Sequence, residues 1–393
     1  MDKIRYFDHA ATTAIKKEVL KEMLPYLKNE YGNPSSLYSI GRKNKKAIEN
    51  ARYEIAKIIN SDKKEIYFTS CGSESDNIAI KGIAYANKNK GNHIITTKIE
   101  HPAVLNSCKI LEKEGFSVTY LNVDKDGLIN LKELEKAINS KTILMSIMFA
   151  NNEIGTIQPI NEIGLIAKKN NIIFHTDAVQ AIGNIEINVK KMNIDLLSIS
   201  AHKFYGPKGV GALYIKNGIK CKKIQDGGHQ EKNLRSGTEN VAGIVGMGKA
   251  LQIAYDNLDI YNKKLINFRD YYIKEIEKRI PHIKVNGHRE KRLPGNTNIS
   301  FKFIEGEELL LELDTKGICV STGSACSSGL EKTSHVLLAI GLEKELAKSS
   351  IRVTFGEENT KKDVEYLIEN LVEIVQRLRN DSPEYLEFVG KKM

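Results

Sequence analysis

The chain has 393 residues, enough for two domains, and its 41% hydrophobic and 27% charged residues are typical of a globular protein. Its net charge of +10 comes from lysines scattered along predicted helix faces, without a dense basic block, so we expect no direct binding of nucleic acid. The longest apolar run, residues 143–150, falls short of the roughly 20 residues of a membrane span, and no signal pattern opens the chain, so we expect a cytoplasmic protein outside the membrane.

The first two thirds of the chain predict an α/β domain. Residues 1–15 form an N-terminal arm, and helical patterns follow over about 16–29 and 41–59. Beyond residue 65, helical stretches separate short β-rich runs at 66–69, 93–97, 117–121, 143–149, 172–176, 196–200 and 210–215. Several runs are apolar throughout, as in strands buried on both faces. The alternation predicts a large domain over 16–255, built on a mostly parallel seven-stranded sheet.

The remaining residues, 256–393, predict a smaller α+β domain. Its expected helices lie near 268–279 and 307–315, from about 334, and over 361–379. Its expected strands lie near 284–286, 298–303, 318–320 and 350–355. A loop rich in serine and glycine, residues 321–329, contains Cys326.

Polar residues follow the predicted strands of the large domain, where a ligand of such a sheet sits. Small residues at 70–73 precede a helix, and a turn of this kind can close on a phosphate. His101, which could equally be structural, can stack on a flat ring or act as an acid or base. Asn152 belongs to a polar cluster after another strand. Asp177, a carboxylate at a strand end, could pair with a protonated pyridine nitrogen, and Gln180 follows three residues later.

Lys203 follows the apolar run 196–200 directly, together with Ser200 and His202. Taken alone, it is read as a surface lysine at a hairpin turn. However, a lysine at the mouth of a buried strand can become a nucleophilic amine that forms a Schiff base with a carbonyl. Five strand ends together suit one aromatic, phosphorylated ligand that carries a carbonyl group. The sequence therefore predicts a site for pyridoxal 5'-phosphate (PLP).

The cysteines indicate a reactive thiol. Their number is odd and no C-x-x-C pair occurs, which argues against a disulfide framework and against a zinc site. Two are most simply read as small core residues, and a third has no catalytic neighbours in sequence; these are Cys108, Cys319 and Cys221. Cys326 lies between serines and glycines and is the expected nucleophile. Cys71, in the phosphate turn, is a candidate second thiol.

Several stretches form an ordered series of motifs along nearly the whole chain. They are Tyr6-Phe-Asp-His-Ala-Ala-Thr-Thr13, Glu100-His-Pro-Ala-Val104, Asn151-Asn-Glu-Ile-Gly155, His175-Thr-Asp-Ala-Val-Gln180, Ser200-Ala-His-Lys203, Arg235-Ser-Gly-Thr-Glu-Asn240, Ser324-Ala-Cys-Ser327 and Ser350-Ile-Arg352. In this series the chain resembles the NifS/IscS-type cysteine desulfurases, PLP enzymes of fold type I and of the class V aminotransferase group. It departs from them at Cys71, where they usually have glycine, and also at His229 and Tyr38.

The resemblance implies a role for each matching residue. Lys203 would hold PLP covalently, Asp177 would face its ring nitrogen, Gln180 would reach the ring oxygen, and His101 would stack on the ring. The phosphate ligands would be Gly72, Ser73, Ser200, His202 and, from the partner subunit of a homodimer, Thr238. Arg352 and Asn152 would hold the substrate carboxylate, since a planar guanidinium suits that task.

The implied activity is the conversion of L-cysteine to L-alanine. Lys203 would move the α-proton, and Cys326 would take the sulfur as a persulfide for an acceptor such as an iron–sulfur scaffold or another sulfur carrier. A selenocysteine lyase would share almost every residue. An aminotransferase would need no thiol, and a non-catalytic protein on this fold would be expected to lack Lys203 or Cys326.

Overall fold

The computed structural model describes residues 4–322 and 333–390. Its centre is a seven-stranded sheet whose strands lie side by side in the order β2 (Ile66–Thr69), β8 (Gly211–Ile215), β7 (Leu196–Ser200), β6 (Ile173–Asp177), β5 (Thr142–Ser146), β3 (His93–Thr97) and β4 (Ser117–Leu121). Strand β8 is antiparallel to both of its neighbours, and the other pairs are parallel. This arrangement confirms the predicted α/β class and the mostly parallel sheet.

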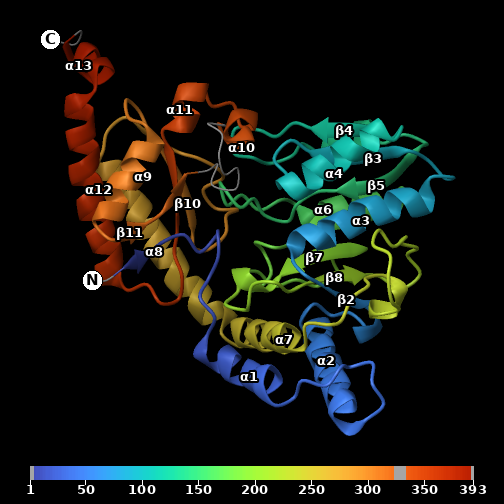
Figure 1. Cartoon of the computed structure of the whole chain (residues 1–393). Coiled ribbons are helices and arrows are strands. Elements are labelled where there is room, and N and C mark those ends of the chain that lie inside the picture. Colours follow the sequence, from blue (N-terminus) through green and yellow to red (C-terminus); the bar gives the residue numbers. More distant parts are fainter. Residues whose placement is uncertain (1–3, 323–332, 391–393) are drawn as a thin grey trace.

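Helices cover both faces of this sheet (Figure 1). They include α3 (Gly72–Asn87), α4 (Pro102–Lys113), α5 (Leu131–Ala137) and α6 (Ile160–Lys169). Strands β3, β7 and β8 are buried at every residue, and two apolar clusters fill the spaces between the sheet and its helices. Burial on both faces explains why these strands are apolar throughout.

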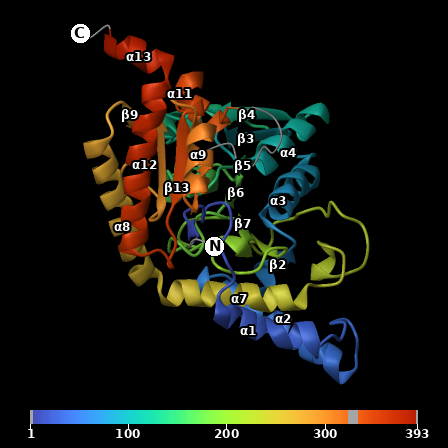
Figure 2. The same ribbon diagram turned by 60° about the vertical axis from the view of Figure 1, so that its left-hand side comes forward.

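A group of three helices packs below the sheet. Helices α1 (Lys17–Lys28) and α2 (Ser39–Ile58) both contact α7 (Val241–Asp256), and Figure 2 shows α7 running beside them. Residues Val19, Ile55 and Met247 of these helices are fully buried in the same apolar cluster as the lower face of the sheet. The three helices therefore share one apolar core with the large sheet.

The C-terminal part has a four-stranded antiparallel sheet in the order β12 (Ser321–Thr322), β13 (Ser350–Thr354), β10 (Asn296–Phe301) and β9 (Ile283–Val285). Helices α8 (Leu258–Arg279), α9 (Gly306–Thr315) and α12 (Lys361–Asp381) pack around a separate core. The remaining elements are β11 (Ile318–Cys319), α10 (His335–Ala339), α11 (Lys344–Lys348), α13 (Pro383–Gly390) and the 3₁₀ turns η1 (Lys63–Glu65), η2 (Ala201–Lys203) and η3 (Glu231–Asn233). The predicted boundary at residue 255 falls near the end of α7, and the division into domains stays a prediction.

The N-terminal arm joins the two parts. Strand β1 (Arg5–Tyr6) pairs in parallel with β11, and Phe7 is fully buried in the core of the C-terminal part. The chain then crosses to the large sheet, where the N–H of Thr13 donates to the carbonyl of His202 at 3.0 Å. In Figure 1 this blue segment runs from the N-terminus toward α1. Among the described residues, no helix has the length and apolar character needed to cross a membrane.

Candidate active site

A cavity of about 240 Å³ opens at the carboxyl ends of five strands of the large sheet. Those strands are β2, β3, β5, β6 and β7, the ones after which the sequence predicts site residues. Most of the predicted residues line this cavity, namely Gly72, Ser73, His101, Asn152, Asp177, Gln180, Ser200, His202, Lys203 and Arg352. The structure therefore brings together groups that lie up to 280 positions apart (352 minus 72) in the chain.

Lys203 ends the 3₁₀ turn η2, which continues directly from the buried strand β7. Its Nζ donates to the carbonyl oxygens of Ala10 at 2.6 Å and Ala11 at 2.7 Å, both in the N-terminal arm. Gln180 reaches the same arm, since its Nε2 donates to the Ala10 carbonyl at 3.0 Å. The backbone of the arm thus holds the amine at the rim of the cavity.

Asp177 is the last residue of β6, and its Oδ1 accepts the N–H of Val179 at 2.9 Å. Burial raises the pKa of the Asp177 carboxyl, while His101 and Lys203 act in the opposite direction. His101 caps α4, where its Nδ1 accepts the N–H of Ala103 at 3.2 Å, and burial lowers the pKa of its ring. The neutral ring therefore carries its proton on Nε2 and can donate it to an atom in the cavity.

The turn before α3 forms a cradle of small residues at the N-terminus of that helix. A Cβ added to Gly72 would lie 2.6 Å from Cγ2 of Val179 and 3.4 Å from Cβ of Ser200, so a larger residue there would crowd the cavity wall. The Ser200 hydroxyl is buried and has no hydrogen-bond partner within the described residues. Free N–H groups at a helix N-terminus together with an unused hydroxyl suit an anionic oxygen ligand.

Arg352 approaches the cavity from β13, with 2% of its surface exposed. Its Nη2 donates to Oδ1 of Asp8 at 2.7 Å, and its Nη1 donates to the backbone carbonyl of Asn152 at 3.1 Å. Its Nε is buried without a hydrogen-bond partner in the part of the chain that the structure describes. A guanidinium with an unused nitrogen at a cavity is suited to bind a carboxylate.

Comparisons with known proteins agree with this arrangement. A model of the Aminotransferase class-V family matches residues 5–367. The chain is 57% identical to the cysteine desulfurase IscS of Clostridium botulinum over 394 residues, which cover 100% of this chain and 99% of that protein. The chain belongs to the NifS/IscS-type cysteine desulfurases of the class V aminotransferase family. This confirms the family that the sequence motifs indicate.

Further proteins resemble the chain over most of its length. It is 54% identical to the cysteine desulfurase IscS of Dictyoglomus turgidum, with 98% of each chain covered. A solved NifS-like protein matches with a TM-score of 0.90 at 39% identity, covering 95% of this chain and 100% of that one. SspA in complex with cysteine matches with a TM-score of 0.81 at 38% identity, covering 89% and 98% respectively.

Cysteine desulfurases of this class depend on PLP, and the residues in the cavity fit that cofactor. The Ser200 hydroxyl, which no described residue binds, and the cradle at Gly72 suit its phosphate group, and the buried Asp177 carboxyl suits a protonated ring nitrogen. His202 is held by a contact of 3.1 Å between its Nδ1 and the Thr12 hydroxyl, and burial lowers the pKa of its ring to about 4. The neutral His202 ring can donate one hydrogen bond to the phosphate.

Sequence reasoning missed a set of buried polar residues beside the cavity. Asp76 lines it from α3, and its Oδ1 lies 3.7 Å from Nε2 of His175 without a hydrogen-bond partner within the described residues. Burial, together with the nearby Asp177, raises the pKa of Asp76 well above its usual range, and burial lowers that of His175 to about 3. The available signal was the spacing of four residues from Gly72, which places Asp76 on the same face of the helix.

Two predicted site residues are not part of the described cavity. Thr238 is exposed on the surface of this chain and does not line the cavity. Cys326 lies outside the described residues. Cys71 lines the cavity, and the Ser70 hydroxyl lies 3.7 Å from its Sγ. The roles of all these residues stay predictions.

Proposed function

We propose that this chain converts L-cysteine to L-alanine and takes up the sulfur as a persulfide on Cys326. The observation that carries the proposal is the convergence of Lys203, Asp177, His101 and Arg352 on one cavity at the strand ends. The relatives that share the whole chain carry the name cysteine desulfurase, and one solved relative is in complex with cysteine.

Lys203, Asp177, Gln180 and the residues around Gly72 would hold PLP, which when bound withdraws electrons from the Cα of the substrate. The guanidinium of Arg352 and the amide of Asn152 bind the substrate carboxylate and orient the amino acid. The Lys203 amine then takes the proton from Cα. His101, with its proton on Nε2, donates a hydrogen bond to the cofactor or the substrate in the cavity.

The sulfur step needs a thiolate. The Cys326 thiolate attacks the substrate sulfur, so an S–S bond forms while the C–S bond breaks, and the carbon that keeps the electron pair is protonated to the methyl group of alanine. Burial raises the pKa of the thiols of Cys108 and Cys221 to about 12 and also raises that of Cys319. Those thiols stay protonated and are poor nucleophiles.

A selenocysteine lyase is the second candidate function, because the same cavity would serve selenocysteine. Comparing the rates of alanine release from cysteine and from selenocysteine separates the two. An aminotransferase would release a keto acid and would not depend on Cys326. The test of the main proposal is therefore to measure alanine and persulfide from L-cysteine with wild-type enzyme and with Cys326→Ser and Lys203→Ala variants.

The proposal includes a homodimer in which Thr238 serves the partner's phosphate site. A row of large apolar side chains supports it, because monomeric proteins rarely expose many such residues together. They lie on α1 and on the segment after it, namely Leu20, Leu24, Leu27, Tyr31, Leu37 and Tyr38, exposed by 39–87%.

The persulfide would pass to an acceptor protein, such as an iron–sulfur scaffold or another sulfur carrier. The free cysteines fit a cytoplasmic location.

A further inference from the structure

The segment Asp8–Thr13 of the N-terminal arm contacts four polar side chains of the active site. Asp8 pairs with Arg352, and the carbonyls of Ala10 and Ala11 accept from Lys203. The Thr12 hydroxyl meets His202, and the Ala10 carbonyl also accepts from Gln180. The cofactor site and the sulfur chemistry described above assign no role to Asp8 itself.

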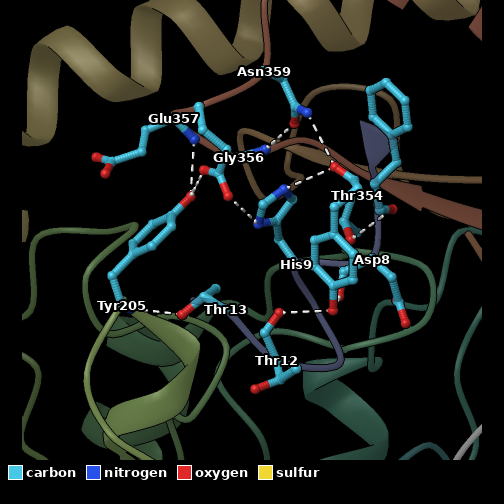
Figure 3. A network of polar contacts seen from close by, with 12 residues as sticks. Asp8, His9, Thr12, Thr13, Tyr205, Thr354, Gly356, Glu357 and Asn359 are labelled. Carbon is cyan, nitrogen blue, oxygen red and sulfur yellow. Dashed lines mark hydrogen bonds and ion pairs between the residues drawn. The ribbon is translucent and has the colours of Figure 1, made fainter. Parts of the chain in front are cut away.

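The arm is fixed on both sides of Asp8. Before it, Asn359 Nδ2 donates to the carbonyl of Tyr6 at 3.0 Å. After it, the Thr13 hydroxyl accepts the N–H of Tyr205 at 2.8 Å. His9 is buried between these anchors. A Cβ added to Gly356 would lie only 2.2 Å from the His9 ring, so only glycine at position 356 leaves room for the ring. Figure 3 shows His9 between Tyr205 and the Gly356–Asn359 segment.

The Asp8 carboxylate is therefore a fixed acceptor beside a buried cation. Removing a guanidinium from water is unfavourable unless an anion and hydrogen bonds compensate it. Asp8 supplies the anion through Nη2 of Arg352, and the Asn152 carbonyl occupies Nη1. Each terminal nitrogen has two hydrogens, so Nη2 keeps one N–H besides the one that Asp8 accepts. Nε has no hydrogen-bond partner within the described residues, and together with Nη2 it can bind a carboxylate through two hydrogen bonds.

We propose that Asp8 is a positioning residue that holds the guanidinium of Arg352 so that its Nε and Nη2 edge receives the carboxylate of the amino-acid substrate. The inference rests on the carboxylate-binding role proposed for Arg352. The substrate and Asp8 share the guanidinium rather than compete for it. Because the same arm segment holds Lys203 through Ala10 and Ala11, the carboxylate pocket and the amine keep a fixed spacing.

The test compares holoenzyme variants by steady-state kinetics. Asp8→Ala should raise the KM for L-cysteine by about tenfold or more, the effect of removing one partner of a buried charge pair, with kcat nearly unchanged. Asp8→Asn retains an acceptor oxygen and should recover most of the affinity. The matched control is Glu358→Gln. Glu358 accepts from the Tyr205 hydroxyl at 2.9 Å in the same network and makes no described contact with Arg352. An unchanged KM in Asp8→Ala, or an equal rise in Glu358→Gln, would overturn the proposal.

A binding measurement separates positioning from general damage to the site. S-methyl-L-cysteine and 2-(methylthio)ethylamine have blocked thiols and differ in the carboxylate, and their binding can be followed by the visible absorption of the holoenzyme. Asp8→Ala should weaken binding of the first and not of the second; equal weakening of both contradicts the proposal. The Arg352→Lys variant separates failure of the role proposed for Arg352 from failure of the role proposed for Asp8. A normal KM in both Arg352→Lys and Asp8→Ala refutes the role proposed for Arg352, whereas a raised KM in Arg352→Lys alone refutes only the role of Asp8.

Discussion

The side-chain nitrogen of Lys203 lies 2.6 Å from the carbonyl oxygen of Ala10, a residue 193 positions earlier in the chain. Strand β7 brings the lysine to the carboxyl ends of the strands of the large sheet. The N-terminal arm, which pairs with the C-terminal part, brings the carbonyl. The amine is therefore held by two segments that no local sequence pattern connects. Its position can be tested chemically.

Borohydride treatment of the yellow holoenzyme should fix the cofactor covalently on the peptide that contains Lys203, and mass spectrometry identifies that peptide. Lys203→Ala should still bind PLP, without a covalent bond, through the phosphate cradle and Asp177, and should form no alanine. Lys208→Ala, which alters an exposed lysine nearby, should behave like wild type. Recovery of the label on a different lysine would refute the assignment of Lys203.

The buried Glu100 carboxyl should make the free energy of unfolding depend on pH. Its side chain is fully buried beside His101, and burial raises the pKa of its carboxyl from 4.5 to about 8. Between these values the folded state holds a proton that the unfolded chain has released, so Glu100 lowers the free energy of unfolding as pH rises from about 4.5 to about 8. Glu100→Gln cannot ionise and should therefore gain stability relative to wild type over that range.

Urea denaturation at a series of pH values measures this difference. The control is Glu135→Gln, which removes an exposed glutamate from the short helix α5 and should track wild type across the range. A constant difference between Glu100→Gln and wild type from pH 4.5 to 8 would contradict a protonated Glu100.

Shared active sites predict complementation between two inactive chains. Lys203→Ala lacks the amine, and a Thr238→Ala chain with weak cofactor binding lacks a phosphate ligand for its partner. A heterodimer of the two should contain one site with both defects and one intact site, so mixing should restore part of the activity. Subunit exchange is verified by native mass spectrometry with two different tags. Exchange without recovered activity would show that Thr238 does not act across the interface.

Much of the large domain could be predicted from sequence, because burial on both faces of a sheet leaves a clear apolar signature. The predicted bounds of β2, β3, β4 and β7 agree with the structure. The predicted strand 143–149 is longer than β5, which ends at Ser146, because the next residues stay buried and two of them, Ile147 and Phe149, still donate to carbonyls of β6. A run of apolar residues predicts burial, but it does not predict the residue at which the strand ends.

The residues of the site could be predicted from sequence more readily than the pairs of residues that contact one another there. The strand-end rule identifies His101, Asp177 and Lys203 individually. The partner of Arg352, by contrast, is Asp8, 344 positions away on the arm, and only the folded structure brings the two together. The buried Asp76 escaped notice because a carboxylate in a helix is usually an exposed residue.

The most direct test of the account is the mass of the Cys326 peptide after a single turnover with L-cysteine. The account predicts one added sulfur atom on that peptide in wild-type enzyme, with none on the peptide that contains Cys71. Cys326→Ser should keep the visible absorption of the bound cofactor and its response to cysteine, while it forms almost no alanine and no persulfide. Added sulfur on Cys71, or alanine released by Cys326→Ser at the wild-type rate, would contradict the account.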